Sequence, residues 1–125
     1  MKYEGTKLPN FEPRTEPVAE LEIIDTETGT GAEVQPGATV TVHYTGALVK
    51  NGIIFQSSLD FGNTISFGLD QVIKGWTQGV PGMKVGGTRR LVIPAEMAYG
   101  SASPAPNIPA NSDLVFDIDL IDISR

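Results

Sequence analysis

Apolar and polar side chains alternate with a period of two along most of the chain after residue 20, which favours strands over helices. In Thr39–Thr45, the side chains of Val40, Val42 and Tyr44 share one face. The same pattern recurs in Asp113–Asp119, where the apolar residues again stand two apart. We therefore predict half-buried antiparallel strands, each with one face in the core and the other in water.

Further short segments rich in β-branched and aromatic residues predict more strands, at residues 20–26, 53–57, 64–69 and 88–94. Asn51-Gly52 precedes the second of these segments, and this pair suits the positive φ angles of a tight hairpin turn. The chain also holds 14 glycines and 9 prolines. That density is typical of many turns rather than of a helical bundle.

One segment has the apolar spacing of a helix longer than a single turn. Its apolar residues recur at intervals of three or four, namely Val72, Ile73, Trp76 and Val80. We predict that Asp70 caps this helix and that Pro81-Gly82 ends it. Gly75 and Gly79 weaken it, so it should be short. Pro94–Ala98 is predicted to add a single further turn.

These elements predict an α+β fold, with an antiparallel sheet of about five strands and one short α-helix across its apolar face. A chain of 125 residues is long enough for one compact domain and too short for two. Residues 1–19 contain three prolines and little apolar periodicity, and we expect an N-terminal arm that is flexible or laid along the surface. Leu8 and Phe11 are its candidate anchors, and residues 20–125 form the predicted domain.

Composition excludes several kinds of chemistry. The chain has no cysteine and a single histidine, which excludes disulfides, thiolate nucleophiles and metal sites that need several such ligands. We expect no metal and no cofactor. The single histidine, His43, lies on the polar face of its strand, where a surface role is the expectation.

Charge and hydropathy restrict the partners and the compartment. A net charge of −6 argues against a nucleic-acid partner. No stretch approaches the roughly 20 apolar residues of a membrane span. The first residues also lack the apolar run of a signal peptide, so we expect a cytoplasmic protein that contacts no membrane.

Two features leave function open. Gly100–Ser112 is a long loop with three prolines, and its length fits a binding element and a plain connector equally well. Seven aromatic residues lie beyond the arm: Tyr44, Phe55, Phe61, Phe67, Trp76, Tyr99 and Phe116. They could all be core residues, or they could line an apolar pocket, and composition does not separate these two interpretations.

Seven short motifs occur in register over roughly residues 20–123. They are Val42-His-Tyr-Thr-Gly46, Phe55-Gln-Ser-Ser58, Phe67-x-Leu69, Val72-Ile-Lys-Gly-Trp76, Gly82-Met-Lys-Val-Gly86, Ala98-Tyr-Gly100 and Leu114-Val-Phe-Asp117. In these motifs the sequence resembles the FKBP-type peptidyl-prolyl cis/trans isomerases. The resemblance implies a strongly twisted antiparallel sheet wrapped around a short helix. It also implies an enzyme that accelerates rotation about X–Pro bonds and assists protein folding.

The same resemblance implies a pocket between helix and sheet, with Trp76 as its floor. The implied catalytic residues are Tyr44, Phe55, Gln56, Trp76, Tyr99 and Phe116, and the implied substrate-binding residues are Ile65, Phe67, Val72, Ile73 and Ile108. Tyr99 would donate its hydroxyl to the substrate, and the backbone N–H of Ile73 would hold a substrate carbonyl. Ile108 would cap the pocket from the proline-rich loop.

The sequence departs from the family pattern at a few positions. Gln56 stands where the family usually has aspartate, and Ile65 where many members have phenylalanine. Pro104 and Asn107 fall where better-known members have other residues. These departures concern rate, sequence preference and affinity for macrolides, and they leave a second hypothesis open: an FKBP-like binding module with weak or no turnover.

The partners implied by the resemblance are proline-containing peptides and folding polypeptides, with macrolides such as tacrolimus or rapamycin as further ligands. No appended dimerisation region is evident in the sequence, so we expect a monomer.

Overall fold

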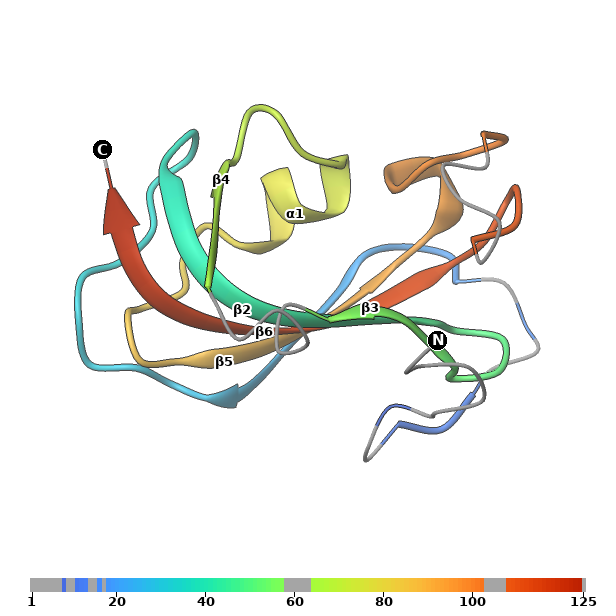
Figure 1. Cartoon of the computed structure of the whole chain (residues 1–125), viewed down its shortest axis with the longest axis horizontal. Coiled ribbons are helices and arrows are strands. Elements are labelled where there is room, and N and C mark those ends of the chain that lie inside the picture. The colour runs from blue at the N-terminus through green and yellow to red at the C-terminus, as the bar shows by residue number, and fades with distance from the viewer. Residues whose placement is uncertain are drawn as a thin grey trace.

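The long strand β2 (Thr39–Leu48) lies inside the sheet and is paired along both of its edges. The computed structural model describes residues 8, 11–13, 16, 18–57, 64–102 and 108–124, and in these ranges six strands form one antiparallel sheet. One edge of β2 pairs with β6 (Leu114–Ser124). Its other edge is shared by β3 (Ile54–Ser57) and β4 (Ile65–Gly68), each beside a different part of β2 (Figure 1).

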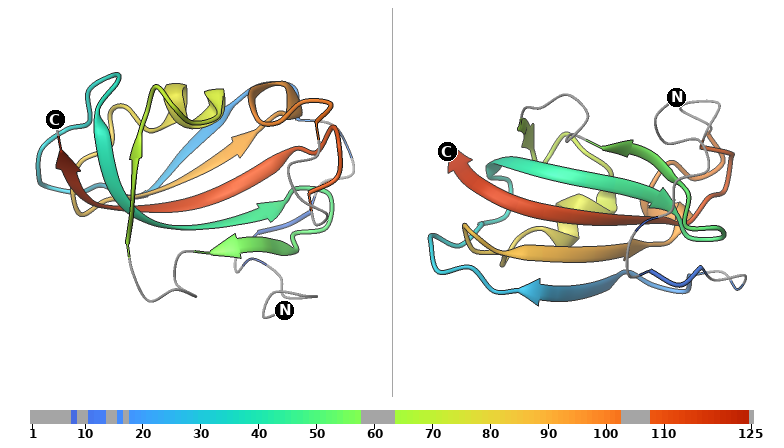
Figure 2. Two further views of the ribbon diagram at one scale, coloured as in Figure 1. Left: turned by 45° about the horizontal axis from the view of Figure 1, so that its top comes forward. Right: turned by 60° about the horizontal axis from the view of Figure 1, so that its bottom comes forward.

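Two strands extend the sheet beyond β6. β5 (Thr88–Ile93) pairs with β6, and β1 (Glu22–Glu27) pairs with β5 at the outer edge. The order is β1-β5-β6-β2-β3, with β4 also beside β2. The described residues therefore contain six strands rather than about five, because β3 and β4 occupy separate stretches of one edge. Figure 2 shows how strongly the strands twist and curve.

The predicted alternation of buried and exposed residues is confirmed in β2. Val40, Val42 and Tyr44 are buried, while Thr41 and His43 between them are half-buried. Hydroxyl pairs join the strands on that more exposed face, with 2.9 Å between Thr41 Oγ1 and Ser66 Oγ and 2.8 Å between the corresponding oxygens of Thr45 and Ser57. The main core thus forms on one face of the sheet, where β5 and β6 add further buried aliphatic side chains.

The predicted hairpin at Asn51-Gly52 is present between β2 and β3. Gly52 has a φ of +73°, a conformation that favours glycine. Its N–H donates to the carbonyl of Leu48 over 2.6 Å, and Asn51 Oδ1 accepts from the N–H of Ile53 over 2.9 Å. The expected turn near residue 95 is also found, as a 3₁₀ helix at Ala95–Met97.

The helix α1 (Lys74–Gly79) lies on the concave side of the sheet, and β2 and β6 curve around it (Figure 1). The prediction that Asp70 caps this helix is wrong. The helix begins after Ile73, whose backbone is extended at φ −60° and ψ 153°, and no side chain caps it. Val72 and Ile73 are β-branched and favour an extended backbone, so the chain enters the helix later than the apolar spacing predicts.

A second apolar cluster lies on the opposite face of the sheet, where the sequence predicts a polar surface. Leu8 and Val18 from the N-terminal arm are buried there. The other buried residues of this cluster come from the strands and the turn after β2: Ala47, Val49, Ile54, Val92 and Val115. The N–H of Leu8 donates to the carbonyl of Gly52 over 2.8 Å, and Phe11 packs against the same cluster. The prediction of a wet outer face is therefore wrong at this end, because the arm covers it.

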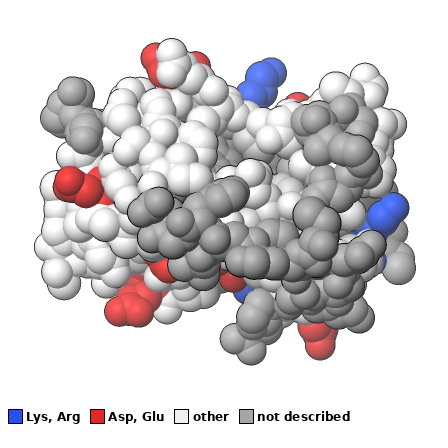
Figure 3. Space-filling model, viewed as in Figure 1, with Lys and Arg blue, Asp and Glu red and all other residues white. Residues whose placement is uncertain are grey.

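One face of the molecule shows how its charged side chains are placed. On the face seen in Figure 3, the described acidic and basic side chains lie mostly near the outline, and much of the described surface between them is uncharged. Among the helices of the described residues, none is long and apolar enough to cross a membrane.

Candidate active site

Three aromatic rings surround the indole of Trp76 between α1 and the sheet. Its ring centroid lies 5.6 Å from that of Tyr44, 5.2 Å from that of Phe67 and 5.4 Å from that of Phe116, each with an edge-to-face orientation. These are favourable distances and orientations for aromatic pairs. Trp76 is only 3% exposed. The indole is therefore held on several sides by rings from three different strands.

Sequence and strand geometry together explain how these rings meet. Tyr44, Phe67 and Phe116 come from β2, β4 and β6, which are neighbours in the sheet. Gly46 follows two residues after Tyr44 on the same face of β2. A Cβ at Gly46 would lie 2.7 Å from ring atoms of both Phe55 and Phe116. Glycine at this position therefore allows both rings to lie directly over the strand backbone.

A cavity of about 530 Å³ opens beside these rings. Its lining consists of Tyr44, Phe55, Gln56, Phe67, Gln71, Val72, Ile73, Trp76, Tyr99 and Phe116. The fold thus brings nine of the eleven predicted site residues around one space, from four strands, the turn that holds Tyr99, and α1 with the residues just before it. Their separation in the sequence, from residue 44 to residue 116, shows that the cavity is assembled by the tertiary structure.

The remaining two predicted site residues do not line the cavity. Ile65 lies on β4 and is partly buried against the main core. Ile108 is buried within that core, at 6% exposure. Their predicted contacts with substrate stay predictions. Phe61, Pro104 and Asn107 lie outside the described residues.

Gln71 lines the cavity and was not predicted as a site residue. Its N–H donates to the carbonyl of Gly68 over 3.0 Å, which closes a turn just before Val72 and the extended Ile73. The sequence feature that points to Gln71 is its place in the chain, directly before the motif that begins at Val72. A polar residue in a short turn carries no periodicity, so the pattern of apolar residues does not select it.

The lining of the cavity contains aromatic, aliphatic and amide side chains, and no carboxylate, lysine, arginine or histidine among the described residues. Burial raises the pKa of Tyr44 above its ordinary value, and the nearby Tyr99 adds to this effect. The Tyr44 hydroxyl therefore stays protonated at neutral pH. Tyr99 is 39% exposed, so its phenol ring stands at the mouth of the cavity.

His43 lies outside this lining, as predicted from its strand face. It is half-buried and stands opposite Asp119 across the β2–β6 pairing. No group of three or more histidine, cysteine or acidic side chains suited to a metal ion occurs in the described part of the chain. The arrangement can hold an apolar group away from water and offer hydroxyl and amide hydrogen bonds to polar groups attached to it.

The fold and this aromatic cavity agree with a family assignment from sequence. A model of the FKBP-type peptidyl-prolyl cis-trans isomerases matches residues 31–121. The chain therefore belongs to the FKBP-type peptidyl-prolyl cis-trans isomerase family.

Individual relatives and solved structures give the same result. The chain is 47% identical over 105 residues to an FK506-binding protein of Neisseria meningitidis serogroup A, covering 82% of this chain and 95% of the relative. It is 48% identical over 93 residues to the peptidyl-prolyl cis-trans isomerase FPR2 of Saccharomyces cerevisiae, covering 73% and 69% of the two chains. A crystal structure of a peptidyl-prolyl cis-trans isomerase from Pseudomonas syringae superposes with a TM-score of 0.76 at 35% identity, covering 88% of this chain and 80% of that one.

Proposed function

We propose that the cavity beside Trp76 is the place where this FKBP-type peptidyl-prolyl cis-trans isomerase accelerates rotation about X–Pro bonds. The observation that carries the proposal is the enclosed indole of Trp76, set among three edge-on rings in a cavity whose described lining has no ionisable group other than tyrosine. Such a site suits a reaction that needs neither a nucleophile nor a metal ion.

The chemistry follows from the peptide bond itself. Resonance keeps the bond planar, with a rotation barrier of roughly 18–20 kcal/mol. In the transition state the amide is twisted, its carbonyl is less dipolar, and it depends less on water. A dry aromatic cavity therefore favours the twisted amide over the planar ground state. Lowering the barrier by about 7 kcal/mol would accelerate rotation about 10⁵-fold.

In this proposal the proline ring rests on Trp76, between Tyr44 and Phe116. The hydroxyl of Tyr99 and the backbone N–H of Ile73 hold carbonyl groups of the substrate chain at the mouth of the cavity. Phe55, Phe67 and Val72 exclude water, since all three line the same space. The substrates are proline-containing peptides and folding polypeptides, and macrolides such as tacrolimus and rapamycin compete for the cavity.

A conservative change inside the cavity tests the proposal. Phe116→Leu keeps an apolar side chain but removes a ring that touches Trp76, and we expect kcat/KM for a Leu-Pro peptide to fall several-fold. Phe11→Leu is the matched control, because Phe11 packs on the opposite face of the sheet. Equal kcat/KM for wild type and a folded Phe116→Leu variant would contradict the site.

A peptide series extends the test to selectivity. We expect Leu-Pro and Phe-Pro peptides to be turned over faster than Glu-Pro peptides, since an unpaired charge is costly to desolvate and the described lining offers no cation. Turnover of Glu-Pro at the rate of Leu-Pro would contradict an apolar cavity.

The second candidate is a binding module of the same fold with weak turnover. Gln56 favours it, because an uncharged amide lines the cavity where the family usually has a carboxylate. An isomerisation assay on short X–Pro peptides, with and without tacrolimus or rapamycin, separates the two candidates. We further propose that the protein acts as a cytoplasmic monomer, which size-exclusion chromatography with light scattering and fractionation of cells test directly.

A further inference from the structure

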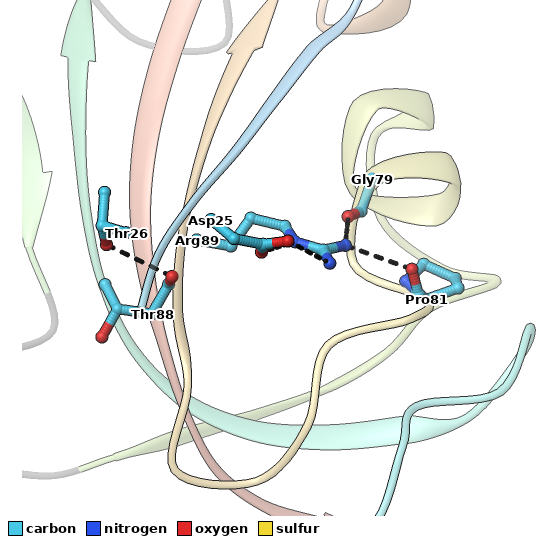
Figure 4. Close-up of polar contacts among 6 residues, drawn as sticks. All are labelled: Asp25, Thr26, Gly79, Pro81, Thr88 and Arg89. Carbon is cyan, nitrogen blue, oxygen red and sulfur yellow. Dashed lines mark hydrogen bonds and ion pairs between the residues drawn. The ribbon is translucent and has the colours of Figure 1, made fainter. Parts of the chain in front are cut away.

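Arg89 of β5 extends from the sheet to the C-terminal end of α1. Its Nη1 donates to the carbonyl of Gly79 over 2.7 Å and to the carbonyl of Pro81 over 3.2 Å (Figure 4). Arg89 is one of the few buried polar residues of the described chain. Gly79 is the last residue of α1, so its carbonyl is among those that lack a partner within the helix. Arg89 thus supplies that partner.

Asp25 holds the other side of the same guanidinium. Its Oδ1 accepts from Arg89 Nε over 2.6 Å, and its Oδ2 accepts from Nη2 over 3.2 Å (Figure 4). This two-point contact fixes the plane of the guanidinium group. Asp25 lies on the edge strand β1, and its side chain is 47% exposed. A chain of contacts therefore runs from β1 through β5 to the end of the helix.

The neighbouring residues of β5 support α1 directly. Because side chains alternate along a strand, Arg89, Leu91 and Ile93 share one face. A Cβ at Gly79 would lie 2.8 Å from the side chain of Leu91, and one at Gly75 would lie 2.5 Å from that of Ile93. The helix backbone thus rests on these two aliphatic side chains. Only Arg89, at the end of the row, adds directional hydrogen bonds.

The hydroxyl of Thr77 ties the middle of the helix to the turn after β4, where it donates to the carbonyl of Leu69 over 2.6 Å. The helix has few other features that set its position. It spans six residues, two of them glycine, with no side-chain cap at its start and no basic residue in its last turn. Short helices of this kind are held by tertiary contacts. Leu91 and Ile93 limit how close the helix comes to the sheet. Apolar contacts have no preferred direction, however, so they allow the helix to shift along its own axis. Hydrogen bonds to Gly79 and Pro81 oppose that sliding.

We propose that Arg89, fixed by Asp25, is a positioning residue that sets where α1 sits on the sheet and hence where Trp76 lies in the cavity. Trp76 is three residues before Gly79 on this short helix, so a displacement of the helix end moves the indole among its surrounding rings. Arg89 itself is not part of the cavity lining. Its effect on isomerisation rests on the proposed role of the cavity, whereas its effect on Trp76 does not.

The fluorescence of Trp76 tests this inference, because it is the only tryptophan in the chain. Arg89→Met removes every donor and keeps an unbranched side chain. We expect the emission of the folded variant to shift to longer wavelength as the indole meets more water, and kcat/KM to fall by about tenfold, since small misplacements of a site are costly. Arg89→Lys should restore part of both properties. Asp25→Ala changes an exposed residue and should shift the emission in the same direction. It replaces Arg89→Met in the test if that variant does not fold.

Arg90→Met is the matched control. Arg90 is the next residue of β5, and its Nε donates to Asp117 Oδ1 over 2.6 Å, the same distance as in the Arg89–Asp25 pair. It lies on the opposite face, where its guanidinium stands 5.6 Å from the ring centroid of Phe11. We expect this variant to lose thermal stability with no shift in the emission of Trp76.

The outcomes separate the possibilities. An emission shift in Arg89→Met that is absent in Arg90→Met supports the inference. Loss of stability in both variants with unchanged emission in both overturns it, because Arg89 then stabilises the fold without positioning Trp76. A shift in emission with unchanged kcat/KM still supports the positioning of Trp76 by Arg89, and it contradicts the proposed catalytic role of the cavity.

Discussion

Gln56 is the residue at which the cavity departs most clearly from the family pattern. It is exposed on β3, between the buried Phe55 and Ser57, and it lines the cavity. An amide oxygen still accepts a hydrogen bond, but it brings no charge. Hydrogen bonds to charged groups contribute roughly 1.5–3 kcal/mol, and neutral ones roughly 0.5–1.5 kcal/mol. The structure thus predicts a modest loss of affinity at this position rather than a loss of the site.

We expect Gln56→Asp to tighten tacrolimus binding about fivefold, which corresponds to about 1 kcal/mol. The gain in kcat/KM for an X–Pro peptide should be smaller. Titration calorimetry and an isomerisation assay measure the two effects. Gln56→Asn is the matched variant, since it shortens the side chain without adding charge. Equal improvement in both variants would show that length matters and charge does not, and no change in either would remove Gln56 from the site.

The ionisation of residues near the cavity predicts a simple pH profile. Burial raises the pKa of Tyr44 from its ordinary value of 10.0, so the Tyr44 hydroxyl stays uncharged at neutral pH. We expect kcat/KM to be nearly constant between about pH 5 and 9, although histidine ordinarily titrates in this range. His43→Gln should leave the profile flat, because His43 lies outside the cavity lining. A bell-shaped profile that disappears in this variant would contradict the proposed mechanism.

The same pKa shift links folding to alkaline pH. The folded state binds the Tyr44 proton more tightly than the unfolded state, so this group's stabilising contribution is complete below pH 10. It decreases as the pH rises through the raised pKa of the folded state. The free energy of unfolding should therefore fall at alkaline pH, and Tyr44→Phe should reduce the slope of that fall.

At the scale of single elements, strand β2 shapes the cavity through a glycine. A Cβ at Gly46 would lie 2.7 Å from the rings of Phe55 and Phe116, so one ring or both must move. We expect Gly46→Ala to lower the free energy of unfolding by about 1–3 kcal/mol, the usual cost of overpacking. It should also lower kcat/KM several-fold. Chemical denaturation and the isomerisation assay measure the two losses.

Gly37→Ala is the control for this prediction. Gly37 has a φ of +79° and open space where the Cβ would be, so alanine there strains the backbone without touching the cavity. Both variants should be less stable than the wild type, but only Gly46→Ala should alter kcat/KM. Full activity in a folded Gly46→Ala variant would show that the ring positions over β2 are not required.

At the scale of the whole molecule, the described residues of the N-terminal arm include some that are packed into the fold. Leu8 is 4% exposed and lies in the second apolar cluster, on the face of the sheet that is opposite α1. Val18 is anchored by its N–H, which donates to Asp113 Oδ2 over 2.8 Å. The predicted boundary at residue 20 stays a prediction. These contacts indicate that Leu8 and Val18 stabilise the domain from the face opposite α1, where they do not line the cavity.

We expect Leu8→Ala to lower the free energy of unfolding by about 2–4 kcal/mol, because the substitution leaves a cavity in a buried cluster. Activity measured well below the melting temperature should be unchanged. Ile23→Ala is the control, since Ile23 is 47% exposed on β1 and its truncation should have little effect. If Leu8→Ala is as stable as the wild type, the arm does not contribute to the folded domain.

Much of the sheet could be predicted from the sequence, because strand periodicity is a local property of the backbone. Residues two apart share a face whatever the rest of the chain does, so the buried face of β2 followed from the order of its residues alone. The hairpin at Asn51-Gly52 and the aromatic set around Trp76 were predicted too. The hairpin depends on the φ of one glycine, and the aromatic set on motifs that resemble a known family.

Other features depend on contacts between residues far apart in the chain, and these only the folded molecule determines. Arg89 and Asp25 are 64 residues apart, and nothing local marks Arg89 as the partner of a helix end. Leu8 and Val18 of the arm cover a face that alternation predicts to be wet. The strand sets which residues share a face, but what packs on a second face decides whether that face is buried too.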